Sequence, residues 1–129
     1  MIVDITNEVV TKLKTILTTA TVLNEYPSTT PTFPCVVVSE LSNNAYLTTR
    51  DTSGFNHSDI SLEINIFTTG SKRMSDAKKI RDAIDGQLSD GYGLIRDFTG
   101  QTPNMDTNIF RYTMRYSGVV DSNRMIHGR

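Results

Sequence analysis

The sequence predicts a single α+β domain over residues 1–129, with a mixed, mostly antiparallel sheet, two helices packed on one face and an extended hairpin arm. Two segments repeat apolar residues at helical spacing. Several other segments alternate apolar and polar residues, or are continuously apolar, as β-strands are. Along the chain the predicted order is helix, strands, helix, strands. With 129 residues, of which 37% are hydrophobic and 21% charged, the chain can bury one core without disulfides or a structural metal.

The first helix is expected over residues 2–20. Its apolar residues recur at steps of three and four and would form one stripe: Ile2, Ile5, Val9, Leu13, Ile16, Leu17 and Ala20. Asp4 or Thr6 can cap the first amides of this helix. Residues 24–34 contain three prolines and are expected to be a loop, because the residue before a proline leaves the helical region.

Four segments are expected to be strands. Residues 35–38 form a continuous apolar run, typical of a strand buried on both faces, and Cys35 is expected to be a small buried hydrophobe there. Residues 59–68 alternate strictly between apolar and other side chains. Residues 94–98 would form a short strand. The last long strand, residues 108–120, has an alternating apolar set: Phe110, Tyr112, Met114 and Tyr116.

The second helix is expected over residues 73–89. Its stripe comprises Met74, Ala77, Ile80, Ile84 and Leu88. Gly91 suits the left-handed residue that commonly follows a helix. Residues 100–108 are expected to be a turn-rich connector. Residues 41–58 are polar and irregular, and a stretch of that length in a small domain is unusual, so we expect an extended arm that forms a long hairpin between strands.

The sequence gives little support for catalysis or for a bound cofactor. The only histidines, His57 and His127, lie in a polar segment and near the chain end, with no partner at metal-ligand spacing. A nucleophile elbow and a phosphate-binding loop are both missing from the sequence. We therefore expect no enzyme activity, no catalytic residue, no cofactor and no metal.

The overall charge and hydropathy also narrow the class of protein. The formal net charge is -1, which lacks the basic surplus of a dedicated nucleic-acid binder. No run of apolar residues approaches the ~20 that a membrane-spanning helix needs, and the first residues do not resemble a signal peptide. We therefore expect synthesis in the cytoplasm and no membrane partner.

Two groups of charged residues show a pattern that could have a function. Basic residues occupy the first half of the second helix and acidic residues its second half, against the helix dipole. Arg111 and Arg115 share the non-apolar face of the last strand, so they should point outward if the aromatic side is core. Each pattern fits either a solvated surface or an interface with a neighbouring subunit.

The order of segments resembles the tail-terminator, or tail-completion, proteins of long-tailed bacteriophages. The resemblance rests on Phe33–Glu40 (FPCVVVSE), the polar arm that follows, Leu62–Phe67 (LEINIF), Ala77–Asp85 (AKKIRDAID) and Ile109–Asp121 (IFRYTMRYSGVVD). It covers nearly the whole chain as a pattern of elements, and no single motif is diagnostic.

The resemblance implies a structural protein of the virion. A ring of six copies would cap the head-proximal end of the tail tube, stop its polymerisation and meet the head connector or stopper protein. DNA would only pass through the lumen. A head–tail adaptor or stopper ring is the alternative within this class, and a small α+β ligand-binding domain is the alternative outside it.

Ten residues are candidate interface positions under this interpretation. The arm would reach a neighbouring subunit or the adjoining ring through Asn43, Asn44, Tyr46, Arg50 and Phe55. The second helix would present an intersubunit or lumen face with Lys78, Arg81 and Asp85, and the last strand would contribute Arg111 and Arg115. The tail, residues 122–129, is expected to become ordered only on assembly.

Overall fold

The computed structural model describes residues 4–28, 31–45, 57–103, 106, 108–121 and 126–127. Its centre is a sheet with the strand order β1-β2-β3-β5-β4, in which the short strand β6 also pairs with β5. The strands are β1 (Thr21–Leu23), β2 (Cys35–Ala45), β3 (His57–Thr68), β4 (Ile95–Thr102), β5 (Phe110–Asp121) and β6 (Ile126–His127). Only β1 and β2 run parallel; the other pairs are antiparallel. The predicted α+β class is therefore confirmed.

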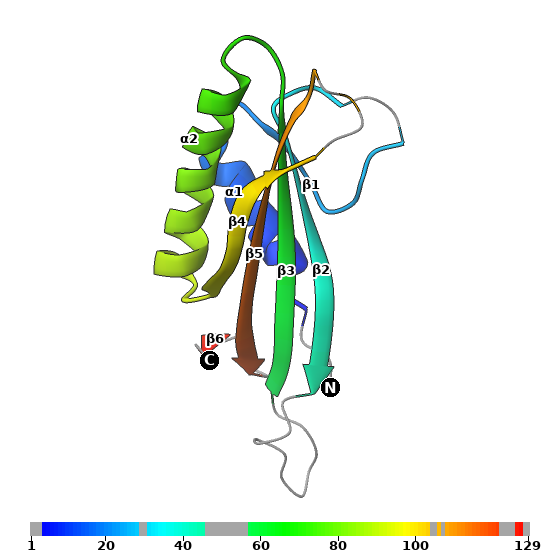
Figure 1. Cartoon of the computed structure of the whole chain (residues 1–129). Helices are drawn as coiled ribbons and strands as arrows, with labels where there is room; N and C mark the ends of the chain where they lie inside the picture. The colour runs from blue at the N-terminus through cyan, green and yellow to red at the C-terminus, as the bar shows by residue number, and fades with distance from the viewer. Residues whose placement is uncertain are drawn as a thin grey trace, which may run out of the picture.

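Both helices, α1 (Thr6–Ile16) and α2 (Arg73–Asp85), lie on one side of this sheet (Figure 1). Alternate residues of β3 and β5 point toward them, so that Ile64, Met114 and Tyr116 are fully buried. Val9 and Leu13 of α1 and Ala77 and Ile84 of α2 complete the same core. The period-two pattern of the strands and the helical stripes therefore converge on one hydrophobic layer, as the sequence predicts.

The first helix is shorter than expected. It ends at Ile16, and after a turn the chain enters β1, which the sequence analysis did not anticipate. Thr21 and Val22 are β-branched, and they pair in parallel with Cys35 and Val36. At the start of α1, the backbone N–H of Thr6 donates to Asp4 Oδ1 at 2.8 Å, which is one of the two predicted caps.

The second helix ends differently from the prediction. α2 continues into a π-helical turn, η2 (Gly86–Gly91), in which the N–H of Tyr92 donates to the carbonyl of Gln87. The left-handed residue after it is Gly93, with φ of 76°, rather than Gly91. Because η2 continues the helix through Gly91, the left-handed residue comes two positions later than expected, just before the chain leaves for β4.

The arm is more regular than its polar sequence suggested. Residues 41–45 belong to β2 and residues 57–58 to β3, and these strands pair as an antiparallel hairpin up to Ala45 and Ser58. A bulge between Glu40 and Ser42 shifts the register. The remaining arm residues, 46–56, lie outside the described part of the chain.

Two other boundaries also differ from the sequence-based expectation. Residues 100–102 belong to β4, not to a connector, because they pair with Arg111–Thr113 of β5. In the tail, Ile126 and His127 pair with Val120 and Val119 of β5, and the expectation that residues 122–129 become ordered only on assembly stays a prediction. The side chains of the two histidines, His57 and His127, lie outside the described part of the molecule.

Candidate functional site: the open face of the sheet

The sheet face opposite α1 and α2 carries no helix among the described elements. Register places Arg111 and Arg115 of β5 on this face, opposite Phe67 and Glu63 of β3. On the other side of β5, Thr102 and Phe98 of β4 pair with the same two arginines. We call this surface the open face, and it holds both strand arginines that the sequence predicted to point outward.

Glu63 lies at the centre of a polar network on the open face. Its carboxylate accepts a hydrogen bond from Arg115 Nε at 3.0 Å, and the second oxygen lies 3.9 Å from Arg111 Nη2. The Glu63 side chain is only 12% exposed, so the two arginine charges balance a carboxylate that is largely withdrawn from water.

Asn65 joins the rest of this network and is fully buried. Its Oδ1 accepts hydrogen bonds from Arg111 Nε at 2.9 Å and from Thr113 Oγ1 at 2.7 Å. Its Nδ2 donates to the hydroxyl of Tyr26 and to Glu63, both at 2.8 Å. One amide therefore uses its acceptor and both donors to connect the loop before β2 with β3 and β5.

Aromatic rings support both arginines. The guanidinium of Arg111 lies 5.8 Å from the ring centroid of Phe67, and that of Arg115 lies 5.7 Å from the centroid of Phe98. Their side chains remain 29% and 52% exposed, respectively. The guanidiniums are thus held in place before any partner arrives, which lowers the entropy that a partner would have to offset.

An apolar groove of about 190 Å³ adjoins the Arg111 end of the open face. Its walls include Tyr26, Pro27, Phe33, Cys35, Val37 and Phe67. Cys35 is fully buried beneath it, as predicted, and burial raises the pKa of its thiol. The predicted role of Cys35 as a small hydrophobe is confirmed.

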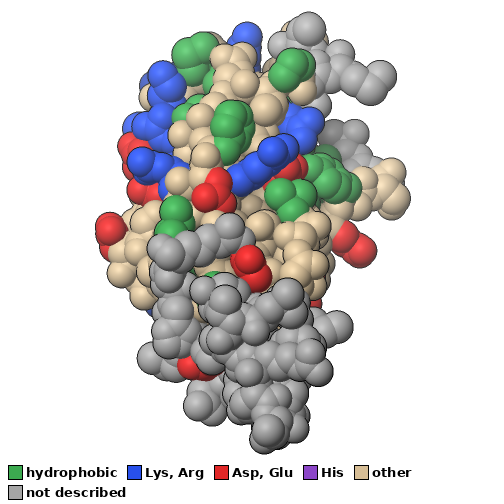
Figure 2. Space-filling model, turned by 60° about the horizontal axis from the view of Figure 1, so that its bottom comes forward, with side chains coloured by type: hydrophobic (Ala, Val, Ile, Leu, Met, Phe, Trp, Pro, Cys, Tyr) green, Lys and Arg blue, Asp and Glu red, His purple; other side chains and the backbone are tan. Residues whose placement is uncertain are grey.

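Figure 2, tilted from the view of Figure 1, shows basic, acidic and hydrophobic side chains interspersed on the surface. The exposed large hydrophobic residues of the described chain include Tyr26, Phe98 and Ile95, of which Ile95 pairs with Ser117 on the face of Arg115, together with Leu41 and Met74. A mixture of arginine, aromatic residues and a small apolar groove is typical of the centre of a protein–protein interface.

The three candidate interface residues of α2, Lys78, Arg81 and Asp85, do not form one surface. Asp85 faces the sheet, where its Oδ1 accepts from Tyr116 Oη at 2.7 Å and Ser89 Oγ at 2.8 Å, and its Oδ2 from Arg96 at 3.0 Å. Burial acts to raise the pKa of Asp85, but these hydrogen bonds and the Arg96 charge outweigh it and lower the pKa. Burial, followed by the bond to Asp85, raises the pKa of Tyr116 well above its ordinary value.

Arg81 and Lys78 have different environments. Arg81 pairs with Asp82 at 2.9 Å, donates to the hydroxyl of Tyr112 at 3.2 Å and stacks over that ring at 5.5 Å. Lys78 is exposed on the outer side of α2. Of the three α2 residues, Arg81 and Asp85 thus have partners within the chain, and Lys78 presents its charge to solvent.

The described arm positions lie at the far end of β2. Asn43 donates to Glu40 Oε2 at 3.1 Å, and Asn44 is exposed beside it. Tyr46, Arg50 and Phe55 lie outside the described residues, so their predicted contacts with a neighbour stay predictions. The structure does not bring Asn43 and Asn44 together with the open-face arginines in one site.

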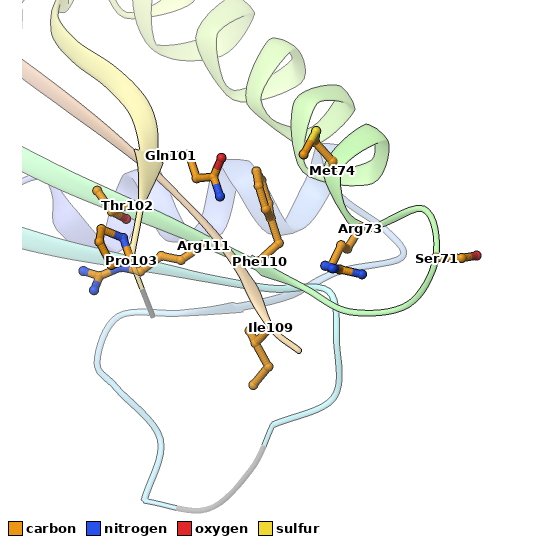
Figure 3. A pocket seen from close by; sticks show the side chains of 9 residues that line it. All are labelled: Ser71, Arg73, Met74, Gln101, Thr102, Pro103, Ile109, Phe110 and Arg111. Carbon is orange, nitrogen blue, oxygen red and sulfur yellow. The ribbon is translucent and has the colours of Figure 1, made fainter. Parts of the chain in front are cut away.

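A larger hollow of about 570 Å³ lies where the start of α2 meets β4 and β5 (Figure 3). Arg73 and Arg111 both line it, but Figure 3 shows the side chain of Arg111 reaching away from Arg73, toward Pro103. Arg73 donates to the carbonyl of Gly70 at 3.0 Å, while Arg111 is engaged by Asn65. The hollow therefore does not concentrate two positive charges on a common point.

Other chemistry has no structural support in the described residues. Within them, no three His, Cys, Asp or Glu side chains gather as metal ligands would. None of the described helices is long and apolar enough to cross a bilayer.

The geometry defines an α+β domain with helices on one sheet face and a polar, arginine-bearing surface on the other. This fold is similar to that of a chain in the structure of the virion of a native gene transfer agent particle. The two chains share 16% sequence identity with a TM-score of 0.56, over 85% of this chain and 84% of that one. No protein-family model matches the sequence, and no curated protein is significantly similar to it.

Proposed function

We propose that this chain is a structural subunit of a virion, and that it forms the ring closing the head-proximal end of a phage tail tube. The observation that carries the proposal is the fold shared with a virion chain over nearly the full length of both chains. Agreement over both lengths favours a common kind of building block, because neither chain contributes a large extra domain that could account for a separate activity.

The particular place in the virion comes from the resemblance to tail terminators. In this role, copies of the chain form a homohexameric ring, one side of which docks on the last ring of the tail tube protein. The other side meets the head connector or stopper protein, and DNA crosses the lumen without a specific binding site. The work of the protein is assembly, with no bond made or broken and no cofactor required.

The open face supports an assembly role. Among the described elements, no helix covers the open face of the sheet, and this surface displays two guanidiniums beside aromatic rings. Arginine and aromatic residues are enriched where proteins bind one another. The internal hydrogen bonds of Glu63 and Asn65 keep this surface soluble in the free subunit while they fix its shape.

Deletion of the gene from its parent particle tests the proposal. We expect electron micrographs to show tails longer than wild type without heads, together with DNA-filled heads without tails. A plasmid copy should restore joined particles of normal tail length, which excludes effects on neighbouring genes.

Two results would contradict the terminator role. Joined particles with normal tails would show that the chain is dispensable for assembly. Tails of normal length beside filled, unjoined heads would instead assign the chain to a head–tail adaptor ring.

A further inference from the structure

We infer that the apolar groove at one end of the sheet receives the arm of a second copy, with the ring of Phe55 as the inserted group. This inference rests on the proposed ring function and names the surface on which the arm of each copy would dock. It commits to residues 46–56 of a neighbouring chain as the occupant of the groove.

The groove forms where the loop before β2 folds over the open face. Cys35 and Val37 lie on this face at the start of β2, and Phe67 of β3 pairs with Cys35 there. The other lining residues are Tyr26, Pro27, Pro31 and Phe33 of the loop, and Ile109 just before β5. With about 190 Å³ and a largely apolar lining, the groove suits one apolar side chain, because a charged group there would lose its hydration without a partner.

The walls of the groove suit an aromatic ring in particular. The rings of Tyr26 and Phe67 meet edge to face, with centroids 6.3 Å apart and planes at 76°. Aromatic rings favour edge-to-face and offset contacts at centroid separations of ~4.5–7 Å. A further ring inserted beside them can make the same kind of contact, and it would cover Tyr26, which is 54% exposed in the single chain.

The arm has the side chains to supply such a ring. Residues 46–56 read YLTTRDTSGFN, and the large apolar or aromatic members are Tyr46, Leu47 and Phe55. Phe55 is the aromatic residue of this set without a polar group, so it gains most from leaving water when two copies meet. Large aromatic residues are also the usual anchors of protein–protein contacts.

The arm and the groove belong to opposite ends of the sheet. The arm follows Ala45, the last residue of β2, and ends at His57, the first residue of β3. The groove is lined by Cys35 and Phe67, at the other ends of the same two strands (Figure 1). Ten residues of extended strand separate these ends, which corresponds to about 33 Å.

The ring of Phe55 therefore cannot fill the groove of its own chain. Phe55 is two residues from His57, so covalent geometry keeps its Cα within about 7 Å of that residue. A second copy must supply the ring. Because arm and groove are different surfaces of one chain, the contact is head-to-tail and can continue from copy to copy until the rotation closes a ring.

The surface beside the groove suits the polar part of the arm. Ile109 lines both the groove and the larger hollow of Figure 3, so the two depressions adjoin. The hollow is lined in part by Gln101 and Thr102, and by Met74, which is 51% exposed. Residues 48–54 of the arm (TTRDTSG) are polar apart from one glycine, so they can form hydrogen bonds there around the inserted ring. An apolar centre within a polar rim is the usual anatomy of an interface.

Photo-cross-linking in cells tests the contact directly. A plasmid copy in which p-benzoyl-phenylalanine replaces Phe55 is supplied to the deleted particle, and the same group in place of Lys14, on the exposed side of α1, is the control. After irradiation we expect a covalent dimer of the chain at about tenfold the control yield, because a docked ring is held beside its target. Mass spectrometry should place the cross-link in a peptide that lines the groove.

Substitutions on both sides of the contact give a second measurement. Phe55→Ser removes the ring, and Ile109→Lys places a charge in the lining at a partly exposed position, so each should lower complementation by about tenfold or more. Asn108→Lys adds the same charge at the neighbouring exposed position, and Thr52→Ala changes the arm without removing a ring. Both controls should complement fully, and Phe55→Ser should keep the wild-type unfolding midpoint in urea.

The outcomes separate this inference from the proposed function. A dimer yield no higher than the control, or full complementation by Phe55→Ser, would overturn the contact while wild-type complementation leaves the ring role intact. A lowered unfolding midpoint for Phe55→Ser would show that the ring packs within its own chain, and would also overturn it.

Two further results would assign the groove to another occupant and so overturn the contact. The first is loss of complementation by Ile109→Lys but not by Phe55→Ser. The second is a cross-link from position 55 to a different virion protein. Failure of the proposed function itself appears earlier, as normal particles without the gene.

Discussion

The two faces of the sheet use the same strands for different purposes. On the covered face, Ile64, Met114 and Tyr116 are fully buried under the helices. One residue along, on the open face, Glu63, Asn65 and Arg115 form hydrogen bonds that end at a half-exposed guanidinium. Since side chains alternate along a strand, the hydrophobic core and the polar surface are separated by a single position. Substitutions on the two faces should therefore affect different measurements.

The largest expected effect is on the covered face. Ile64→Ala removes buried methyl groups and leaves a cavity under the helices, so we expect the free energy of unfolding to fall by ~2–5 kcal/mol. Urea denaturation followed by circular dichroism measures it. Thr102→Ala on the open face is the control. If the two variants lost similar stability, the division between the faces would be wrong.

A smaller loss is expected at Asn65, which belongs to the open face but is fully buried. Asn65→Ala removes the hydrogen bonds to Arg111, Thr113 and Tyr26 and leaves the 12% exposed carboxylate of Glu63 without one of its donors, so we expect a loss of ~1–3 kcal/mol. The same urea titration applies. Asn24→Ala, which loses one exposed contact to Asn7 at 3.2 Å, should change stability little. An unchanged Asn65→Ala midpoint would mean that the network does not contribute to folding.

Asp85 gives a pH-dependent effect on the covered side. The pKa of its carboxyl is lower in the folded protein, so its contribution to stability is complete above the ordinary pKa of about 3.9. That contribution is lost as the pH falls from this value through the lowered pKa. In Asp85→Asn, stability should be lower at neutral pH and fall less steeply below pH ~4.

Unfolding midpoints between neutral pH and pH 3 check this expectation. Asp82→Asn, which removes one carboxylate at a side chain that is 71% exposed, is the matched control. An Asp85→Asn profile parallel to wild type would indicate that the bonds of Asp85 to Tyr116 and Arg96 do not favour its charged form.

The sequence was sufficient for the covered face and the class of fold. Strict alternation in residues 59–68 and 108–120 and the two helical stripes identified most of the core, because burial of one face imposes a fixed period. The three-residue strand β1 was missed, since so short a parallel strand has no period of its own. The π-turn was missed because nothing in residues 86–91 indicates that the backbone hydrogen bonds change from the i to i+4 pattern to the i to i+5 pattern.

The open face was predicted only in part. Alternation placed Arg111 and Arg115 outside the core, but their partners depend on the register between β3 and β5, which pairs residues about 50 positions apart. The polar residues Glu63 and Asn65, which alternate with the apolar ones in residues 59–68, were the available signal, but alternation does not indicate which residues they contact. The bonds of Asp85 arise in the same way, from tertiary contacts that local sequence does not specify.

The smallest expected change in the free energy of unfolding is at Arg115. This substitution best distinguishes a role of the open face in assembly from a role in stability. Arg115→Ala removes a half-exposed guanidinium from a carboxylate that is 12% exposed but that keeps Asn65 and Arg111, so the free energy of unfolding should fall by about 1 kcal/mol, less than at Asn65. Complementation of the deleted particle should nevertheless fall clearly if the open face has the assembly role that we propose for it. Lys14→Ala on α1 should affect neither measurement. A variant that loses assembly while keeping its unfolding midpoint would show that the open face serves association; full complementation would mean that its arginines only stabilise the subunit.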